Sequence, residues 1–186
     1  KEAIMADFYT VNICGRKENL PIIELKEGLS IAFFNLHGNQ DLTEYCGKML
    51  AKRIKESGKQ VDVLITAESK GLQLTHVVAR ELGHKFYAVA RKSVKLYMKD
   101  GISATVKSIT TGGDQTLYLS AHDAELLKDK KVGIVDDVVS TGGSLRGMEA
   151  LVEKAGGSIA LRATVLAEGD AAKRDDLIFL DSIPLL

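Results

Sequence analysis

The sequence predicts an α/β fold with a mainly parallel sheet flanked by helices, together with a small N-terminal hood and a flexible lid hairpin. Short apolar runs of strand length recur along most of the chain. Segments with helical spacing of apolar residues separate several of these runs, and glycines follow those segments. Such alternation of strand and helix is typical of a parallel sheet that is covered on both faces. The runs lie at residues 61–66, 85–90, 131–135, 158–166 and 177–180.

The N-terminal residues differ from the rest of the chain. They contain short apolar or alternating runs separated by turn-forming residues, which predicts small strands. We expect residues 1–38 to form a hood and residues 39–186 to form the core. The runs are 8–14, 22–25 and 29–35, and the breaks between them are Gly15, Pro21 and Gly28.

Helices are expected where apolar residues recur at three- and four-residue spacing. These segments are 39–57, 72–82 and 145–155, and a glycine that can end a helix follows each of them. Residues 93–119 break the alternation, because they are rich in Gly, Ser and Thr and parts of them alternate like strands. A long insertion at the ligand edge of a sheet is often a lid, and we expect a lid here. A surface hairpin without a role is the alternative.

Composition limits the classes of function. The 186 residues are 45% hydrophobic and 27% charged, which fits one globular domain. Lys plus Arg and Asp plus Glu both number 25, so no net basic charge favours nucleic acid. Cys14 and Cys46 are far apart, which argues against a zinc site and a disulfide scaffold. No apolar run approaches the roughly 20 residues of a membrane span and no signal peptide is visible, so we expect a cytoplasmic protein.

The segment that follows residues 131–135 carries the strongest functional signal. Asp136 and Asp137 precede two valines, and the small residues 140–144 come next. The backbone N–H groups of such a turn, at the start of a helix, can surround a phosphate. Carboxylates accept hydrogen bonds from sugar hydroxyls or hold Mg²⁺. The pattern therefore predicts a site for a phosphorylated ribose.

Other phosphate-binding loops fit this segment less well. No lysine follows the glycines, as it would in a P-loop, and the glycine spacing is not that of a dinucleotide-binding turn. A helix-capping turn without a ligand is the remaining alternative, although capping needs only one Asp or Ser.

Residues 132–144 resemble the phosphoribosyl pyrophosphate (PRPP) signature of the type I phosphoribosyltransferases, with Gly133 in place of the usual aliphatic residue. The resemblance extends over about residues 61–168 and is nearest to the adenine and xanthine branches. It implies transfer of the 5-phosphoribosyl group from PRPP to a purine base, with Mg²⁺ as cofactor, in a homodimer. It also implies that Asp136 and Asp137 serve catalysis and metal binding. The residues implied for the 5′-phosphate are Val138, Val139, Ser140, Thr141, Gly142, Gly143 and Ser144.

The same resemblance implies a pyrophosphate site built from two loops. Residues 67–71 match the pyrophosphate loop of the family, with Lys70 in place of the commoner Arg. The Glu68–Ser69 peptide is a candidate for a non-proline cis bond. The basic residues after the next strand are expected to face pyrophosphate, and a solvated basic stretch is the alternative. The implied set is Glu68, Ser69, Lys70, Gly71, Arg91, Lys92 and Lys95.

The proton donor and the base are less well defined. Residues 107–112 lack the lid carboxylate of many adenine enzymes, so substrate contacts, water and Tyr97 stay open as proton donors. Glu168 lies where the family places base-contacting residues. Gly169 stands where the xanthine branch has a lysine, which favours adenine as the base. Phe33 or Phe34 could stack on the purine, and hood core is the alternative for both.

Two further functions remain open at this stage. A PRPP-sensing regulator with the same fold is favoured by the missing lid carboxylate and disfavoured by the neutral charge. A xanthine, orotate or hypoxanthine-guanine phosphoribosyltransferase would keep the same chemistry with a different base.

Overall fold

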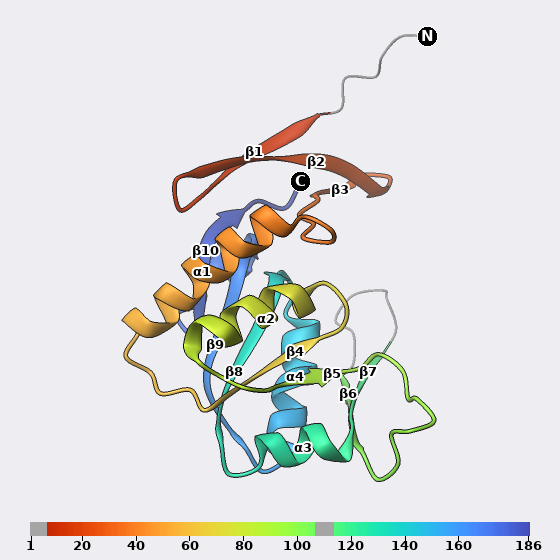
Figure 1. Ribbon diagram of the computed structural model, residues 1–186. Coiled ribbons are helices and arrows are strands. Elements are labelled where there is room, and N and C mark those ends of the chain that lie inside the picture. The colour runs from red at the N-terminus through yellow and green to blue at the C-terminus, as the bar shows by residue number, and fades with distance from the viewer. Residues whose placement is uncertain (1–6, 107–113) are drawn as a thin grey trace.

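The computed structural model describes residues 7–106 and 114–186. Its centre is a five-stranded sheet of order β10-β9-β8-β4-β5, in which all neighbouring strands are parallel (Figure 1). Each strand matches one of the five apolar runs, so the predicted fold class is confirmed. The strands are β4 (Val63–Ala67), β5 (Tyr87–Ala90), β8 (Lys131–Val139), β9 (Ser158–Glu168) and β10 (Leu177–Ile183).

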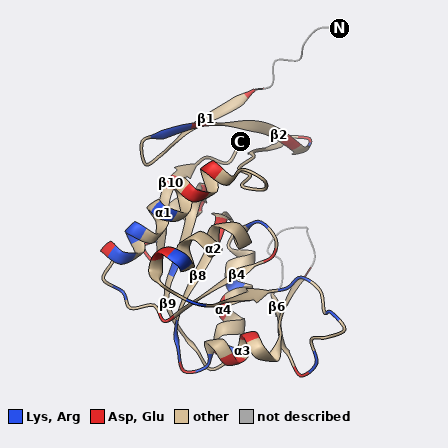
Figure 2. Cartoon of the chain, in the orientation of Figure 1, with Lys and Arg blue, Asp and Glu red and all other residues tan. Residues whose placement is uncertain are grey.

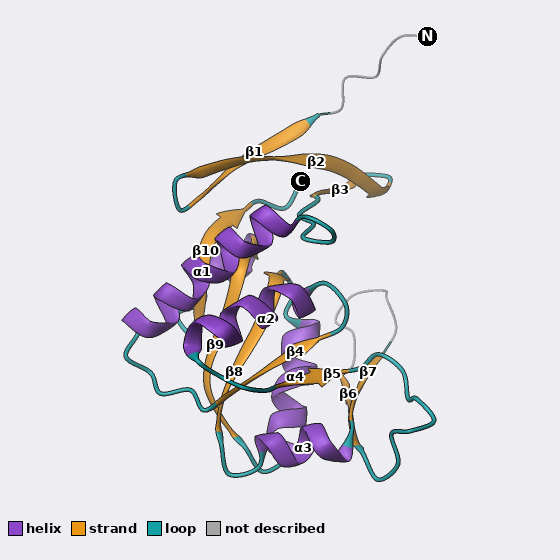
Figure 3. Cartoon of the chain, in the orientation of Figure 1, coloured by secondary structure: helices purple, strands orange, loops and turns teal. Residues whose placement is uncertain are grey.

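Helices cover both faces of this sheet (Figure 3). α1 and α2 share one hydrophobic core with the hood, whereas α3 and α4 contribute to a second core on the other face. The alternation of side chains along a strand separates the two cores, since Ile134 belongs to the second core and its neighbour Val135 to the first. The helices are α1 (Gln40–Glu56), α2 (Gly71–Leu82), α3 (Ala121–Leu127) and α4 (Gly143–Lys154).

The N-terminal strands form an antiparallel sheet of order β1-β2-β3 that lies beside α1 and β10 (Figure 1). The predicted break at Pro21 is wrong, because Pro21 lies inside β2. Residues 16–21 pair with β1 and residues 22–26 with β3, so the proline stands where β2 changes partner. There its missing N–H costs little, and its carbonyl accepts a hydrogen bond from Phe33 N at 2.9 Å. The strands are β1 (Phe8–Ile13), β2 (Arg16–Lys26) and β3 (Leu29–Ala32).

The predicted lid hairpin is confirmed in its two strands, β6 (Ile102–Val106) and β7 (Gln115–Leu119), which pair antiparallel. The hairpin packs on α4, because a Cβ added at Gly147 would lie 2.8 Å from Leu117 Cδ1. A bridge between Arg91 and Tyr118 ties β7 to the end of β5. The tip, where the lid carboxylate is missing, lies outside the described residues.

Two elements were not predicted. α3 has only seven residues, and its signal is the serine at its start: Ser120 Oγ accepts a hydrogen bond from Asp123 N at 3.1 Å. A short 3-10 helix, η1 (Gly169–Lys173), follows β9. Figure 2 shows basic and acidic residues interspersed over the molecule, in keeping with 25 of each. Among the described helices, none has the length and hydropathy needed to cross a membrane.

Candidate active site

The acid pair lies in the last part of β8. We expected the strand to end at residue 135, but β8 continues to Val139, so Asp136, Asp137, Val138 and Val139 are strand residues. The two acids escaped a strand assignment because Asp is rare in strands. Asp136 lies beside the start of α2, since a Cβ at Gly71 would be 3.4 Å from its Oδ1.

The surroundings of the acid pair disfavour the charged form of Asp136. Burial, as the largest cause, and the neighbouring Asp137 carboxyl together raise the pKa of Asp136 to about 8. Asp136 Oδ1 accepts the Asp137 N–H at 2.9 Å. Asp137 is only 6% exposed, and its Oδ2 has no hydrogen-bond partner in the described part of the chain. A buried carboxylate oxygen without a partner is costly, so this pair is suited to a donor or cation that a ligand brings.

The turn between β8 and α4 has the features of an anion site. Gly142 has φ +76°, and α4 begins one residue later, at Gly143. Among the described residues no side chain caps α4, and its first turn holds no acidic residue. Its first N–H groups and the positive end of its dipole are therefore available to an anion.

Two arginines flank the same turn. Arg146 Nη1 donates a hydrogen bond to Thr141 O at 2.9 Å. A Cβ at Gly142 would lie 3.5 Å from Nη1 of Arg146 and 3.5 Å from Nη1 of Arg174. Arg174 is held by Asp176 through Nε and Nη2, both at 2.8 Å. Sequence reasoning missed both arginines, because nothing in the signature indicates that residues 146 and 174 converge on the turn.

The predicted pyrophosphate loop connects β4 to α2. The Glu68–Ser69 peptide is cis, as expected. The Glu68 carboxylate accepts the Lys92 N–H at 2.8 Å and Arg91 Nη1 at 3.3 Å. These donors hold the pKa of Glu68 below its usual range, with the Lys92 N–H as the largest cause. The side chain of Glu68 therefore links the loops after β4 and β5 and stabilises the basic residues there.

The base-stacking candidates differ in burial. Phe34 is 2% exposed and belongs to the core that the hood shares with α1 and α2, so it has no free ring face for a base. Phe33 is half-buried, and the Lys70 ammonium lies 4.8 Å above the centre of its ring. The structure therefore brings Phe33 and Lys70 together and leaves Phe33 as the stacking candidate.

The remaining predicted residues lie at the edges of the site. Glu168 ends β9 and is 8% exposed. Lys95 and Tyr97 lie between β5 and β6, in the segment that precedes the hairpin. Tyr97 is 71% exposed.

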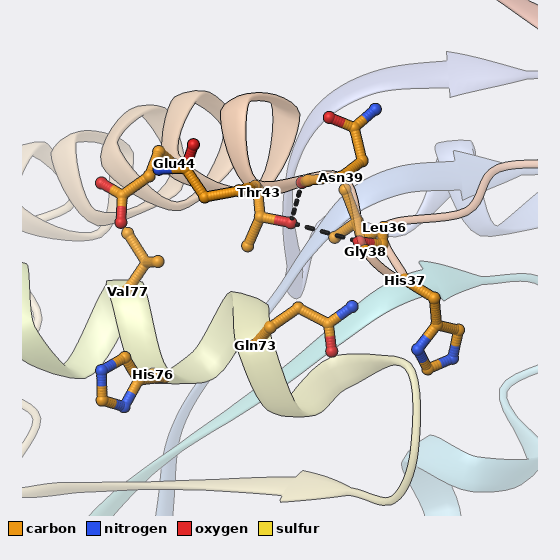
Figure 4. Close-up of a pocket in the computed structure, with 10 residues that line it drawn as sticks. Leu36, His37, Gly38, Asn39, Thr43, Glu44, Gln73, His76 and Val77 are labelled. Carbon is orange, nitrogen blue, oxygen red and sulfur yellow. Dashed lines mark hydrogen bonds between the residues drawn. The ribbon is translucent and has the colours of Figure 1, made fainter.

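A hollow with a volume of about 450 Å³ lies between the start of α1 and the middle of α2 (Figure 4). Polar side chains contribute to its wall, and Figure 4 shows Gln73 extending from α2 into the space beside Thr43. No local sequence pattern indicates this hollow, because its residues come from two segments about 30 positions apart, 36–44 and 73–77.

Metal binding can be judged from the donor set. Within residues 7–106 and 114–186, no three His, Cys, Asp or Glu side chains gather in a way that would hold a metal ion. Asp136 and Asp137 supply carboxylate oxygens only, which suits Mg²⁺. Mg²⁺ is commonly held by one or two carboxylates with substrate phosphates and water completing its shell. The residues thus fit a Mg²⁺ ion that is shared with a bound phosphorylated ligand.

These features define an α/β protein whose glycine-containing turn, acid pair and basic loops meet at the carboxyl edge of a parallel sheet. The family model described as "Phosphoribosyl transferase domain" matches residues 35–184, and the chain belongs to this family. The resemblance seen in the sequence and the expected enzyme class, a phosphoribosyltransferase, are confirmed.

Several relatives carry purine enzyme names. The chain is 32% identical over 172 residues to an adenine phosphoribosyltransferase of Clostridium botulinum, covering 91% of this chain and 95% of that protein. It is 31% identical over 148 residues to a xanthine phosphoribosyltransferase of an Exiguobacterium, covering 79% and 74%. The crystal structure of adenine phosphoribosyltransferase from Thermoanaerobacter pseudethanolicus superposes with a TM-score of 0.73 at 22% identity, covering 88% and 95%, which supports the fold.

Proposed function

We propose that the protein is a purine salvage enzyme that transfers the 5-phosphoribosyl group of PRPP to a purine base, with adenine as the favoured base. The observation that carries this proposal is the buried Oδ2 of Asp137, which has no hydrogen-bond partner in the described part of the chain and lies a few residues before α4, a helix that none of the described side chains caps. A ribose 5-phosphate needs both: an acceptor for its hydroxyls and, one turn further on, donors for its phosphate.

The reaction forms a bond between a ring nitrogen of the base and C1′ of the ribose. The C1′–O bond breaks, its electron pair leaves with pyrophosphate, and the base nitrogen loses its proton. As positive charge develops on the ribose in the transition state, Asp136 and Asp137 would stabilise it and orient the hydroxyls. Mg²⁺ bound with PRPP would neutralise charge on the pyrophosphate, and the same two carboxylates would hold it.

The 5′-phosphate would be bound by the turn that ends at Ser144, through backbone N–H groups and the hydroxyls of Ser140, Thr141 and Ser144. Val138 and Val139 are strand residues, so they would position the turn and would not donate hydrogen bonds to the phosphate.

Pyrophosphate would be bound by backbone N–H groups at Ser69 and Gly71 and by basic side chains. The Lys70 ammonium lies 4.8 Å above the ring of Phe33, so this side chain could contact both the pyrophosphate and a base stacked on that ring. Arg91 and Lys92 are fixed by Glu68, and Lys95 follows them. Glu68 thus acts as a positioning residue, since a carboxylate would repel pyrophosphate.

The base would lie between the hood (residues 1–38) and the end of β9, which belongs to the core (residues 39–186). Phe33 offers a ring face and Glu168 a carboxylate that accepts from an exocyclic amino group. Gly169 supplies no cation for the oxygen of an oxidised purine, which favours adenine over xanthine. We also propose that residues 93–119 close over PRPP, and that the enzyme is a cytoplasmic homodimer that does not bind nucleic acid.

The test is pyrophosphate release with PRPP and Mg²⁺, using adenine, xanthine, hypoxanthine, guanine and orotate in parallel. We expect release with adenine, and a large loss of kcat/KM in Asp137→Asn with the fold retained. Release with another base alone would correct the substrate. Silence with every base, in a protein that PRPP still protects against heat, would instead support a PRPP-sensing regulator.

A further inference from the structure

The residues that follow β10 cover a glycine at the end of β9. A Cβ added at Gly169 would lie 2.9 Å from both Cγ and Cδ1 of Leu185, and its next neighbour, at 3.8 Å, is Leu185 Cδ2. Gly169 also has φ +58°, a conformation that side-chain-bearing residues rarely adopt. The side chain of Leu185 therefore fills the space that a side chain at position 169 would need.

Backbone contacts fix Leu185 in this place. On one side, Ile183 pairs with Glu168 in the parallel ladder of β10 and β9. On the other side, Ser30 N in β3 donates a hydrogen bond to Leu186 O at 3.1 Å. Residues 184–186 thus span from the end of the core sheet to the hood, and Figure 1 shows them passing beneath the hood strands.

Only part of the Leu185 side chain is used in this contact. The residue is 60% exposed although it lies against Gly169, so it presents an apolar surface next to the end of β9, where Glu168 stands. An apolar wall next to a hydrogen-bond acceptor suits a flat heterocycle that carries an amino group. It disfavours an oxo group on the same edge of the ring, because that oxygen would lose water without gaining a donor.

We propose that Leu185 is a specificity-determining residue that forms the apolar wall of the base site, in place of the side chain that position 169 lacks. This role rests on the proposed function, since it requires the base to bind beside Glu168. It adds a residue from outside the sequence motifs to the site, and it makes the segment after β10 part of substrate recognition.

Steady-state kinetics of Leu185→Ala tests the role. We expect the KM for adenine to rise about tenfold, as for the loss of a contacting leucine side chain. The KM for PRPP should stay within about twofold of the wild type, because the phosphate turn and the acid pair are unchanged. Leu185→Lys, which adds an ammonium group at the wall, should lower the ratio of kcat/KM for adenine to that for xanthine.

The control is Phe86→Ala, which also removes an exposed apolar side chain. Phe86 is 59% exposed and precedes β5, so it lies at the amino edge of the sheet, away from the site. Its KM values should equal those of the wild type. If Leu185→Ala keeps the wild-type KM for adenine in an active enzyme, Leu185 has no role in base recognition. If the wild type releases no pyrophosphate with any base, the proposed function itself is wrong, and the role of Leu185 falls with it.

Discussion

Gly71 lies so close to Thr66 that no side chain fits between them: a Cβ at Gly71 would be 2.2 Å from Thr66 Oγ1. The same Cβ would be 3.4 Å from Asp136 Oδ1. Gly71 begins α2, so this contact sets the distance from the pyrophosphate loop to the acid pair. The arrangement of the two halves of the site depends on the absence of one methyl group.

Gly71→Ala should therefore damage binding as well as folding. Forcing the start of α2 away from β4 costs about 1–3 kcal/mol of stability, as overpacking usually does. Because both loops move relative to Asp136, we expect kcat/KM for PRPP to fall by at least about tenfold. Urea denaturation and initial-rate kinetics measure the two effects.

Gly47→Ala is the matched control for that variant. A Cβ at Gly47 would lie 2.4 Å from Val77 Cγ1, where α1 packs on α2 away from the two loops. It should lose about 1–3 kcal/mol of stability and keep the wild-type KM for PRPP. Equal losses of kcat/KM in the two variants would show that Gly71 matters only for packing.

The pKa of Asp136 predicts how stability changes with pH in the absence of ligand and Mg²⁺. It rises from 3.8 to about 8 on folding, so the folded protein binds the proton more tightly than the unfolded chain. Stability should then be highest below the unfolded value and fall as pH rises toward about 8. Asp136→Asn cannot ionise, and its Tm should exceed that of the wild type at pH 8 but not at pH 4. Parallel Tm profiles for the two proteins would show that folding does not raise the pKa of Asp136.

The sheet could be predicted because its strands are buried on both faces and read as continuous apolar runs. The end of β8 could not, because the strand continues through Asp136 and Asp137, and acids usually mark the end of a strand. Phe33 and Phe34 look equivalent in the sequence, and only the fold of the hood shows that Phe34 faces the core. Leu185 and Arg174 reach the site from distant segments, and no local pattern reports such contacts.

Lys70 and Phe33 predict a coupling between PRPP and the base. The Lys70 ammonium lies 4.8 Å above the ring on which we propose the base stacks, so it competes with the base when pyrophosphate is absent. Lys70→Ala should weaken pyrophosphate binding by about tenfold, as for one charge-assisted hydrogen bond, and should strengthen adenine binding to the protein without PRPP. Calorimetric titration with each ligand measures both effects. Weaker binding of adenine in Lys70→Ala would contradict this competition.

Replacing Arg146 should affect the binding of ribose 5-phosphate without affecting the binding of pyrophosphate. Its Nη1 donates to Thr141 O at 2.9 Å, so this hydrogen bond fixes one carbonyl of the turn to which we assign the 5′-phosphate. Arg146→Ala should weaken the binding of ribose 5-phosphate by roughly 2- to 10-fold, the range expected for one hydrogen bond. Pyrophosphate binding should not change, because that site lies on the loops after β4 and β5.

Arg146→Lys and Arg80→Ala distinguish geometry from charge. The lysine variant keeps the positive charge without the planar donor group, so it should restore only part of the affinity for ribose 5-phosphate. Arg80 is also an arginine, but its partners are Glu44 and Glu81 on α1 and α2, and Arg80→Ala should bind both ligands normally. If Arg146→Lys binds ribose 5-phosphate as well as the wild type, then charge alone accounts for the effect and the hydrogen bond to Thr141 does not position the turn.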